Sequence, residues 1–140
     1  MKNHLESTTQ VHKAISHPAR MRILGMLKGG ELCVCQLTAA LDLAPSTVSA
    51  HLSELRRAGL ITERKEGRWV HYDLAQTQVA TRYLELLWLQ LRGDEQMAND
   101  EAAVRSLRSI SVEELCGMST QRVRRTVCNT KPKRTRSRTS

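Results

Sequence analysis

The chain has 140 residues, with 22 Lys and Arg against 14 Asp and Glu and a formal net charge of +8. This length suits one domain of ordinary size with an extension. A run of about 18 apolar residues, which a membrane-spanning helix needs, is absent. The N-terminal residues also lack the apolar stretch of a signal peptide, so we expect a cytoplasmic protein that does not enter a membrane.

The basic excess is concentrated near the end of the sequence. All 14 acidic residues precede residue 121, whereas residues 121–140 hold eight basic side chains and no acid. Thr, Ser and Pro separate these charges, so we expect a basic disordered tail over residues 119–140. Two interpretations stay open, a sequence-independent contact with phosphates and a solvated tail. Any DNA affinity that the tail adds should fall steeply with salt.

Two helices are expected in the first 30 residues. Ser7-Thr8-Thr9-Gln10 is a capping-box pattern, so the first helix should run from there to about Ser16. Pro18 opens the second helix, because Pro is well tolerated at the first helical position, and Gly29-Gly30 ends it. The buried stripe of this second helix should consist of Ile23, Leu24 and Leu27.

A helix-turn-helix is predicted next. One short helix should run from Cys33 or Val34 to Leu41, and another should start at Pro45 and end at a left-handed cap at Gly59. Residues 42–44 form a tight turn between them. Two short helices joined in this way are typical of a DNA-binding unit.

The second of these helices is the expected recognition helix. Val48, Leu52 and Leu55 have the spacing of a buried face, which directs small polar side chains outward. His51 lies at the edge of the buried face, so we expect it to pack rather than to contact a base. Residues at the N-terminal end of a recognition helix approach base edges. The candidate DNA contacts on this helix are Ser46, Thr47, Ser49, Ala50, Ser53 and Arg57.

A β-hairpin is expected after the recognition helix. Residues 60–64 and 69–74 are β-prone, and residues 65–68 between them contain a glycine. The hairpin would form a wing beside the recognition helix. Lys65 and Arg68 at its tip are candidate contacts to the DNA backbone.

The remaining helices divide the chain into domain and extension. The apolar stripe of residues 77–92 is wide, so we expect this helix to form a homodimer interface with the first helix; a buried core helix is the alternative. This completes a domain over residues 1–97. A C-terminal helical extension over 98–118 should contain a helix from Asp100 to Ile110, capped by Asn99. A capping box at 111–114 then launches a short turn that ends at Cys116-Gly117.

Cys33 and Cys35 stand at the start of the first helix of the helix-turn-helix, where both sulfurs can reach one ion. Soft thiolates select thiophilic metals or metalloids. Structural disulfides are not expected in a reducing compartment. Packing as small hydrophobes is the alternative, but the neighbouring polar side chains disfavour it. An enzyme with one of these thiols as nucleophile and His51 or His71 as base lacks any further acid–base set or phosphate-binding loop, so no enzymatic activity is predicted.

Four segments resemble the ArsR/SmtB family of dimeric winged-helix metalloregulatory repressors. They are His17-Pro18-Ala19-Arg20-Met21-Arg22-Ile23-Leu24, Glu31-Leu32-Cys33-Val34-Cys35-Gln36-Leu37, Ser46-Thr47-Val48-Ser49-Ala50-His51-Leu52 and Gly67-Arg68-Trp69-Val70-His71-Tyr72. The likeness covers about residues 5–95. It implies a mainly α, homodimeric winged helix-turn-helix that binds operator double-stranded DNA. The thiol segment is most similar to the arsenite- and antimonite-responsive members, which implies repression of a metalloid-resistance operon.

The resemblance also raises the question of a third ligand. Arsenite favours three thiolates, and the arsenic-repressor pattern has another cysteine three residues after the second, where this chain has Thr38. Cys116 is favoured as the third ligand over Cys128, and a small-molecule thiol is another option. We expect no permanently bound cofactor, only As(III) or Sb(III) as inducer. The alternatives are Zn or Cd, and cysteine oxidation. Because no histidine follows His71, the carboxylate–histidine zinc site of related repressors cannot be built.

Overall fold

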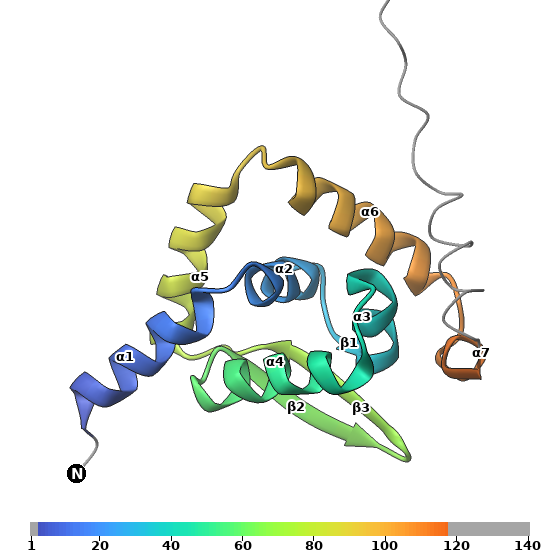
Figure 1. The fold of residues 1–140 in the computed structure, drawn as a ribbon, viewed down its shortest axis with the longest axis horizontal. Helices are drawn as coiled ribbons and strands as arrows, with labels where there is room; N and C mark the ends of the chain where they lie inside the picture. Colours follow the sequence, from blue (N-terminus) through green and yellow to red (C-terminus); the bar gives the residue numbers. More distant parts are fainter. Residues whose placement is uncertain (1–2, 118–140) are drawn as a thin grey trace, which may run out of the picture.

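The computed structural model describes residues 3–117, which form seven helices and a three-stranded sheet (Figure 1). In chain order the elements are α1 (His4–Ile15), α2 (Pro18–Leu27), β1 (Leu32–Cys33), α3 (Val34–Leu41), α4 (Pro45–Arg57), β2 (Ile61–Glu66), β3 (Trp69–Leu74), α5 (Gln78–Leu91), α6 (Glu95–Arg108) and α7 (Val112–Gly117). Cys128 and the basic tail lie outside the described residues. Within residues 3–117, no helix combines the length and the apolar character that crossing a membrane requires.

The helix starts follow local capping, and one differs from the prediction. α1 begins at His4, because the side chain of Asn3 accepts a hydrogen bond from the Glu6 amide at 3.2 Å. The capping box predicted at Ser7 is therefore wrong, and the Ser7 hydroxyl donates to the His4 carbonyl inside the helix. Pro18 and Pro45 open α2 and α4 as predicted.

The core lies between α2 and the helix-turn-helix. The predicted stripe of Ile23, Leu24 and Leu27 is buried, and Val48, Leu52 and Leu55 of α4 are buried with it. Asp42 makes the turn between α3 and α4 in the left-handed region, at φ 56°, and Gly59 follows α4 at φ 77°.

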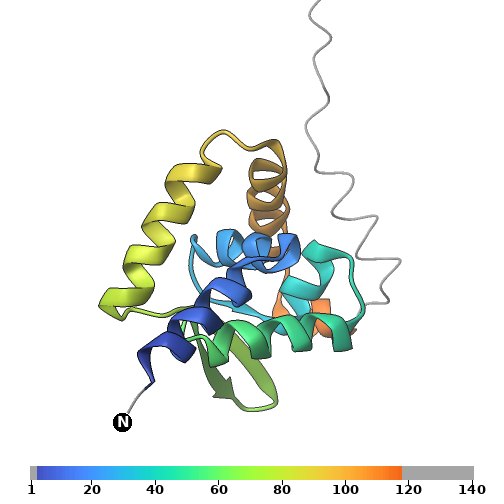
Figure 2. The same cartoon turned by 60° about the vertical axis from the view of Figure 1, so that its left-hand side comes forward.

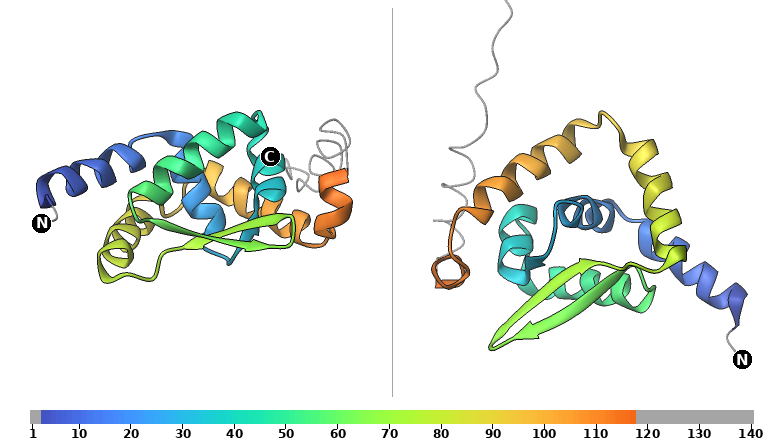
Figure 3. Two further views of the ribbon diagram at one scale, coloured as in Figure 1. Left: turned by 90° about the horizontal axis from the view of Figure 1, so that it is seen from below. Right: turned by 180° about the vertical axis from the view of Figure 1, so that it is seen from behind.

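The sheet has the strand order β1-β3-β2, and both pairs are antiparallel. β2 continues to Glu66, so only Gly67 and Arg68 separate the two long strands, in place of the predicted four-residue loop. β1 was not expected as a strand, because two residues carry no period. Figure 3 shows the hairpin of β2 and β3 extending alongside α4 and past its end, as a wing does.

α6 differs most from the prediction. It begins at Glu95 because the Asp94 carboxylate accepts from the Met97 amide at 3.0 Å, so the start expected near Asp100 with Asn99 as cap is wrong. The expected domain boundary after residue 97 falls inside this helix. α6 passes over α2 and α3, while α5 stands at the side of the molecule (Figures 1 and 2). The predicted cap of the last turn is present, since Ser111 Oγ accepts from the Glu114 amide at 3.2 Å.

Candidate functional site

The N-terminal half of the outward face of α4 carries only small side chains. Val48, Leu52 and Leu55 point into the core, so the opposite face meets solvent. The predicted contact residues on this helix are all exposed, namely Ser46, Thr47, Ser49, Ala50, Ser53 and Arg57. A helix whose exposed face carries hydroxyls and one methyl can come close to base edges in a major groove.

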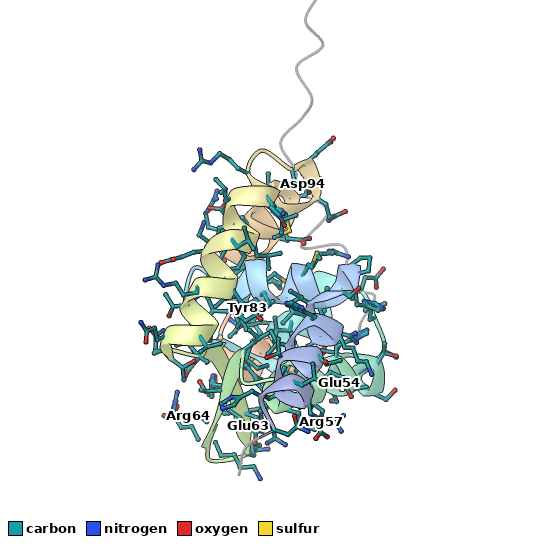
Figure 4. The ribbon with its side chains drawn as sticks, turned by 90° about the vertical axis from the view of Figure 1, so that its left-hand side faces the viewer. Glu54, Arg57, Glu63, Arg64, Tyr83 and Asp94 are labelled. Atoms are coloured by element: carbon teal, nitrogen blue, oxygen red, sulfur yellow. A yellow bond between two sulfur atoms is a disulfide. The ribbon has the colours of Figure 1, made fainter. Side chains whose placement is uncertain are left out.

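The basic candidates have different surroundings. Arg57 forms an ion pair with Glu54 of the same helix, whereas Lys65 and Arg68 are exposed on the wing. The Arg68 guanidinium lies 5.5 Å from the ring centroid of Trp69. Figure 4 shows Arg57 and Glu54 on α4 and Arg64 on the hairpin at the same end of the molecule. Cationic side chains of α4 and of the hairpin therefore lie on the same side of the molecule.

His51 connects α4 to the corner between α1 and α2. Its Nδ1 lies 3.3 Å from the Arg20 guanidinium, and its ring lies 4.5 Å from that of His17. Arg20 also donates to the carbonyls of Lys13 and Ala14 at the end of α1. Burial, and then the charges of His17 and Arg20, lower the pKa of His51. The imidazole is half-buried and packs against Arg20 and His17, as expected.

Three sulfur atoms meet at the start of α3. Those of Cys33, Cys35 and Cys116 all lie within 4.8 Å of one another. Cys33 is the N-cap of α3, and its amide donates to the Gln36 side chain at 2.9 Å. The sequence suggested an exposed position for both thiols of the pair, but Cys33 is buried, with 2% of its surface exposed, and Cys35 is half-buried. The extension supplies the third sulfur by covering the pair.

Cys35 and Cys116 are joined as a disulfide, and Cys33 is a free thiol. A disulfide was not expected from the sequence. The bond links α3 of the helix-turn-helix to α7, across 81 residues of sequence. Thr38, one turn after Cys35, has a buried hydroxyl without a hydrogen-bond partner in the described part of the chain. Its hydroxyl is a hard donor and a poor substitute for a thiolate.

α6 holds the segment that carries Cys116. The Asp100 carboxylate, 4% exposed, receives two hydrogen bonds of 2.9 Å from Arg22 of α2 and a third of 2.9 Å from Gln96. The methyl end of the Met97 side chain of α6 packs over Gly25 of α2. Leu107 and Leu115 are buried in a second apolar cluster with Cys35 at its edge. Together these contacts bring α7 against α3.

Sequence patterns gave no indication of the Arg22–Asp100 pair. The two residues are 78 positions apart, and Asp100 was assigned to a helix start. The local sign that this face is buried is the helical spacing of Asp100 with Ala103, Val104 and Leu107. The ion pair between Glu31 and Arg64, beside the thiols, was missed for the same reason.

Comparisons with known proteins identify the fold and the family. Residues 17–63 match the family model for bacterial regulatory proteins of the arsR family. The arsenical resistance operon repressor of Escherichia coli is 45% identical over 67 residues, which are 47% of this chain and 57% of that protein. The arsenic resistance transcriptional regulator ArsR2 of Pseudomonas putida is 34% identical over 93 residues, which are 66% of this chain and 80% of that protein. The chain spans about half the length of the first of these curated relatives.

A solved structure agrees with the described fold. The homodimeric winged helix-turn-helix DNA-binding domain of a possible ArsR-family transcriptional regulator from Mycobacterium bovis is 31% identical. It has a TM-score of 0.56 and covers 66% of this chain and 83% of its own. The predicted winged helix-turn-helix class is thereby confirmed, and these relatives are transcription regulators rather than enzymes. The chain belongs to the ArsR family of bacterial regulatory proteins.

Proposed function

We propose that the chain is a dimeric operator-binding repressor that arsenite or antimonite releases from DNA by binding Cys33, Cys35 and Cys116. The observation that carries this proposal is the meeting of three sulfurs within 4.8 Å of one another at the start of α3. As(OH)₃ can react with the three thiols, so that three As–O bonds are replaced by three As–S bonds and each hydroxyl group leaves as water with a thiol proton. The cysteines must be reduced for this reaction, so the Cys35–Cys116 bond has to be open.

The donor set favours a trivalent metalloid over zinc. Structural zinc takes four ligands, usually cysteine or histidine. Among residues 3–117 the cluster consists of three cysteines, and no carboxylate or imidazole belongs to it. Three soft donors and no fourth suit a pyramidal ion that is thiophilic.

The position of the site explains how inducer and DNA oppose each other. Cys33 caps α3 and Cys35 lies in its first turn, and α3 packs directly against α4. Drawing three sulfurs onto one ion changes the start of α3, and thereby the orientation of α4 relative to the wing. Linkage then requires that operator DNA weaken arsenite binding by the same factor.

The test is an operator-binding titration with arsenite under reducing conditions. We expect arsenite to weaken operator binding by the wild-type protein by roughly 10- to 100-fold, within the usual range of allosteric coupling. Cys33→Ser and Cys35→Ser should bind the operator normally and lose most of this response. Release by arsenite that survives both substitutions rejects the site. Cys128→Ser is the matched control, since it removes a thiol from the tail.

The Cys35–Cys116 disulfide supports a second candidate function, a repressor that responds to oxidation. Hydrogen peroxide would take two electrons from the two thiols, forming one S–S bond and two waters. The titration separates the candidates if free thiols are counted after each treatment. An oxidation sensor changes operator affinity when peroxide removes two thiols, and it ignores arsenite in the presence of a reductant.

The dimer should form through α1 and α5. Val79, Leu86 and Leu89 of α5 are 54–63% exposed, and Leu5 of α1 is 78% exposed. Large apolar side chains that are exposed in the single chain, on two neighbouring helices, indicate a face that a second protein chain covers. The relative from Mycobacterium bovis is homodimeric, which supports the proposal of a dimer.

Replacing both Leu86 and Leu89 with lysine should raise the dimer dissociation constant by about a hundredfold or more. Four buried leucines are lost from a two-fold interface, and each contributes about 1.5–3 kcal/mol. Sedimentation equilibrium measures the change. Thr81→Lys, an exposed position on the flank of the same helix, is the control for added charge. A double variant that stays dimeric would place the interface elsewhere.

A further inference from the structure

The sensor thiol lies in one row with two side chains of the wing sheet. Cys33 on β1 is directly opposite His71 on β3, and His71 is directly opposite Arg64 on β2. Directly opposed residues of antiparallel strands project from the same face of a sheet. Cys33, His71 and Arg64 therefore share a face, and β1, which carries Cys33, is an edge strand of the sheet.

Glu31, two residues before Cys33, spans this row. Its carboxylate receives hydrogen bonds from Arg64 at 2.5 and 3.1 Å and lies 3.6 Å from His71 Nδ1. Arg64 also binds Glu66 at 3.0 Å. The side chain of Glu31 is thus fixed to β2.

The backbone of Glu31 is held from the other direction. Arg108 of α6 donates to the carbonyl of Glu31 at 3.3 Å and to that of Gly30 at 3.0 Å. The segment leading into Cys33 therefore connects the extension that carries Cys116 with the wing. A displacement of the strand that carries Cys33 can therefore act on both the extension and the wing.

β2 also contacts the recognition helix, through the residue next to Arg64. The Glu63 carboxylate accepts from Arg56 of α4 at 2.9 Å and from the Tyr72 hydroxyl at 3.2 Å. Adjacent residues of a strand face opposite sides. β2 therefore binds Glu31 on one face and α4 on the other, and Figure 4 shows Glu63 and Arg64 together on the hairpin.

We propose that the Glu31–Arg64 ion pair couples the inducer site to the wing, so that inducer binding repositions the wing together with α4. The inference rests on the proposed function. Cys33 must move toward the other two sulfurs to share an ion with them, and its two-residue strand moves with it. Pairing with β3 and the ion pair to β2 carry that displacement to the hairpin that holds Lys65 and Arg68.

The experiment compares Glu31→Gln, Arg64→Gln and the double variant with wild type. Operator affinity is measured with and without arsenite, and arsenite affinity is measured without DNA by thiolate absorbance. An exposed ion pair contributes modestly, so we expect the arsenite-induced loss of operator affinity to shrink roughly two- to fivefold. The double variant should show no larger effect than either single one. Arg105→Gln, which breaks the exposed Arg105–Glu101 pair on α6, is the matched control.

A second readout reports the wing directly. Trp69 opens β3 opposite Glu66, and in a Trp88→Phe background it is the one tryptophan left. Arsenite should shift its emission in that background and shift it less when Glu31→Gln is added. If the ion pair only stabilised the fold, Glu31→Gln would leave the arsenite-induced shift of Trp69 emission unchanged.

The outcomes separate this inference from the proposed function. A wild-type protein that ignores arsenite overturns both. If all three variants respond to arsenite as the wild type does, in operator affinity and in Trp69 emission, the coupling is overturned and the proposed function is not. A third outcome is that Arg64→Gln weakens operator binding by the same factor with and without arsenite, while Glu31→Gln does not weaken it. Arg64 would then be a phosphate contact, and the coupling would be overturned.

Discussion

Replacing Ala50 with glutamate should reduce operator affinity by about a hundredfold or more, because it places a carboxylate at the centre of the outward face of α4. Like charges brought together at an interface cost several kcal/mol, and a dimer carries the substitution twice. Ala50 is exposed and glutamate is a good helix former, so the fold should not suffer. Fluorescence anisotropy with a labelled operator measures the loss.

Two controls identify the cause of that loss. Ala50→Gln has the same length without the charge, so its smaller loss measures steric exclusion from the groove. Ala98→Glu makes the same change in net charge at an exposed position of α6 and should leave operator affinity within about threefold, as surface substitutions usually do. Equal losses in Ala50→Glu and Ala98→Glu would mean that α4 does not enter the groove.

The helix-turn-helix was predictable because its signals are local. Pro45 marks the start of α4, Gly59 marks a left-handed cap, and the spacing of Val48, Leu52 and Leu55 gives the buried face. Each of these signals acts within one or two helical turns. The hairpin was predictable for the same reason, since β-prone runs flank a glycine.

The surroundings of the thiols were predictable only in part. The sequence favoured Cys116 as a partner for Cys33 and Cys35, and the structure places the three sulfurs together. That expectation came from the need of arsenite for a third thiolate, and no sequence pattern predicted the geometry. The burial of Cys33 was missed because its surroundings come from distant parts of the chain, since β1 pairs with β3 and the Cys116 sulfur of α7 lies within 4.8 Å. No local pattern encodes the docking of a helix about 70 residues downstream. The same limit hid the Arg22–Asp100 and Glu31–Arg64 pairs.

The docking of α6 leads to the second large effect. Asp100→Ala should weaken arsenite binding about tenfold while leaving operator affinity within about threefold. The substitution removes a nearly buried carboxylate from the paired guanidinium of Arg22, and breaking such pairs is strongly destabilising. Arg22 is partly exposed, so it can turn to water, and the cost falls on the packing of α6 against α2. Alanine favours helix, so α6 itself should persist.

A double-mutant cycle shows whether Asp100 acts through the third thiol. Glu101→Ala, which breaks an exposed ion pair one residue further along α6, should leave arsenite affinity unchanged. If α6 serves to hold Cys116 beside α3, Asp100→Ala should cause little further loss in a Cys116→Ser background, because the ligand that it positions is already absent. Additive losses would instead mean that Asp100 stabilises the Cys33–Cys35 pair itself. If Asp100→Ala reduced operator affinity as much as arsenite affinity, α6 would be needed for the DNA-binding fold and would not serve mainly to hold Cys116.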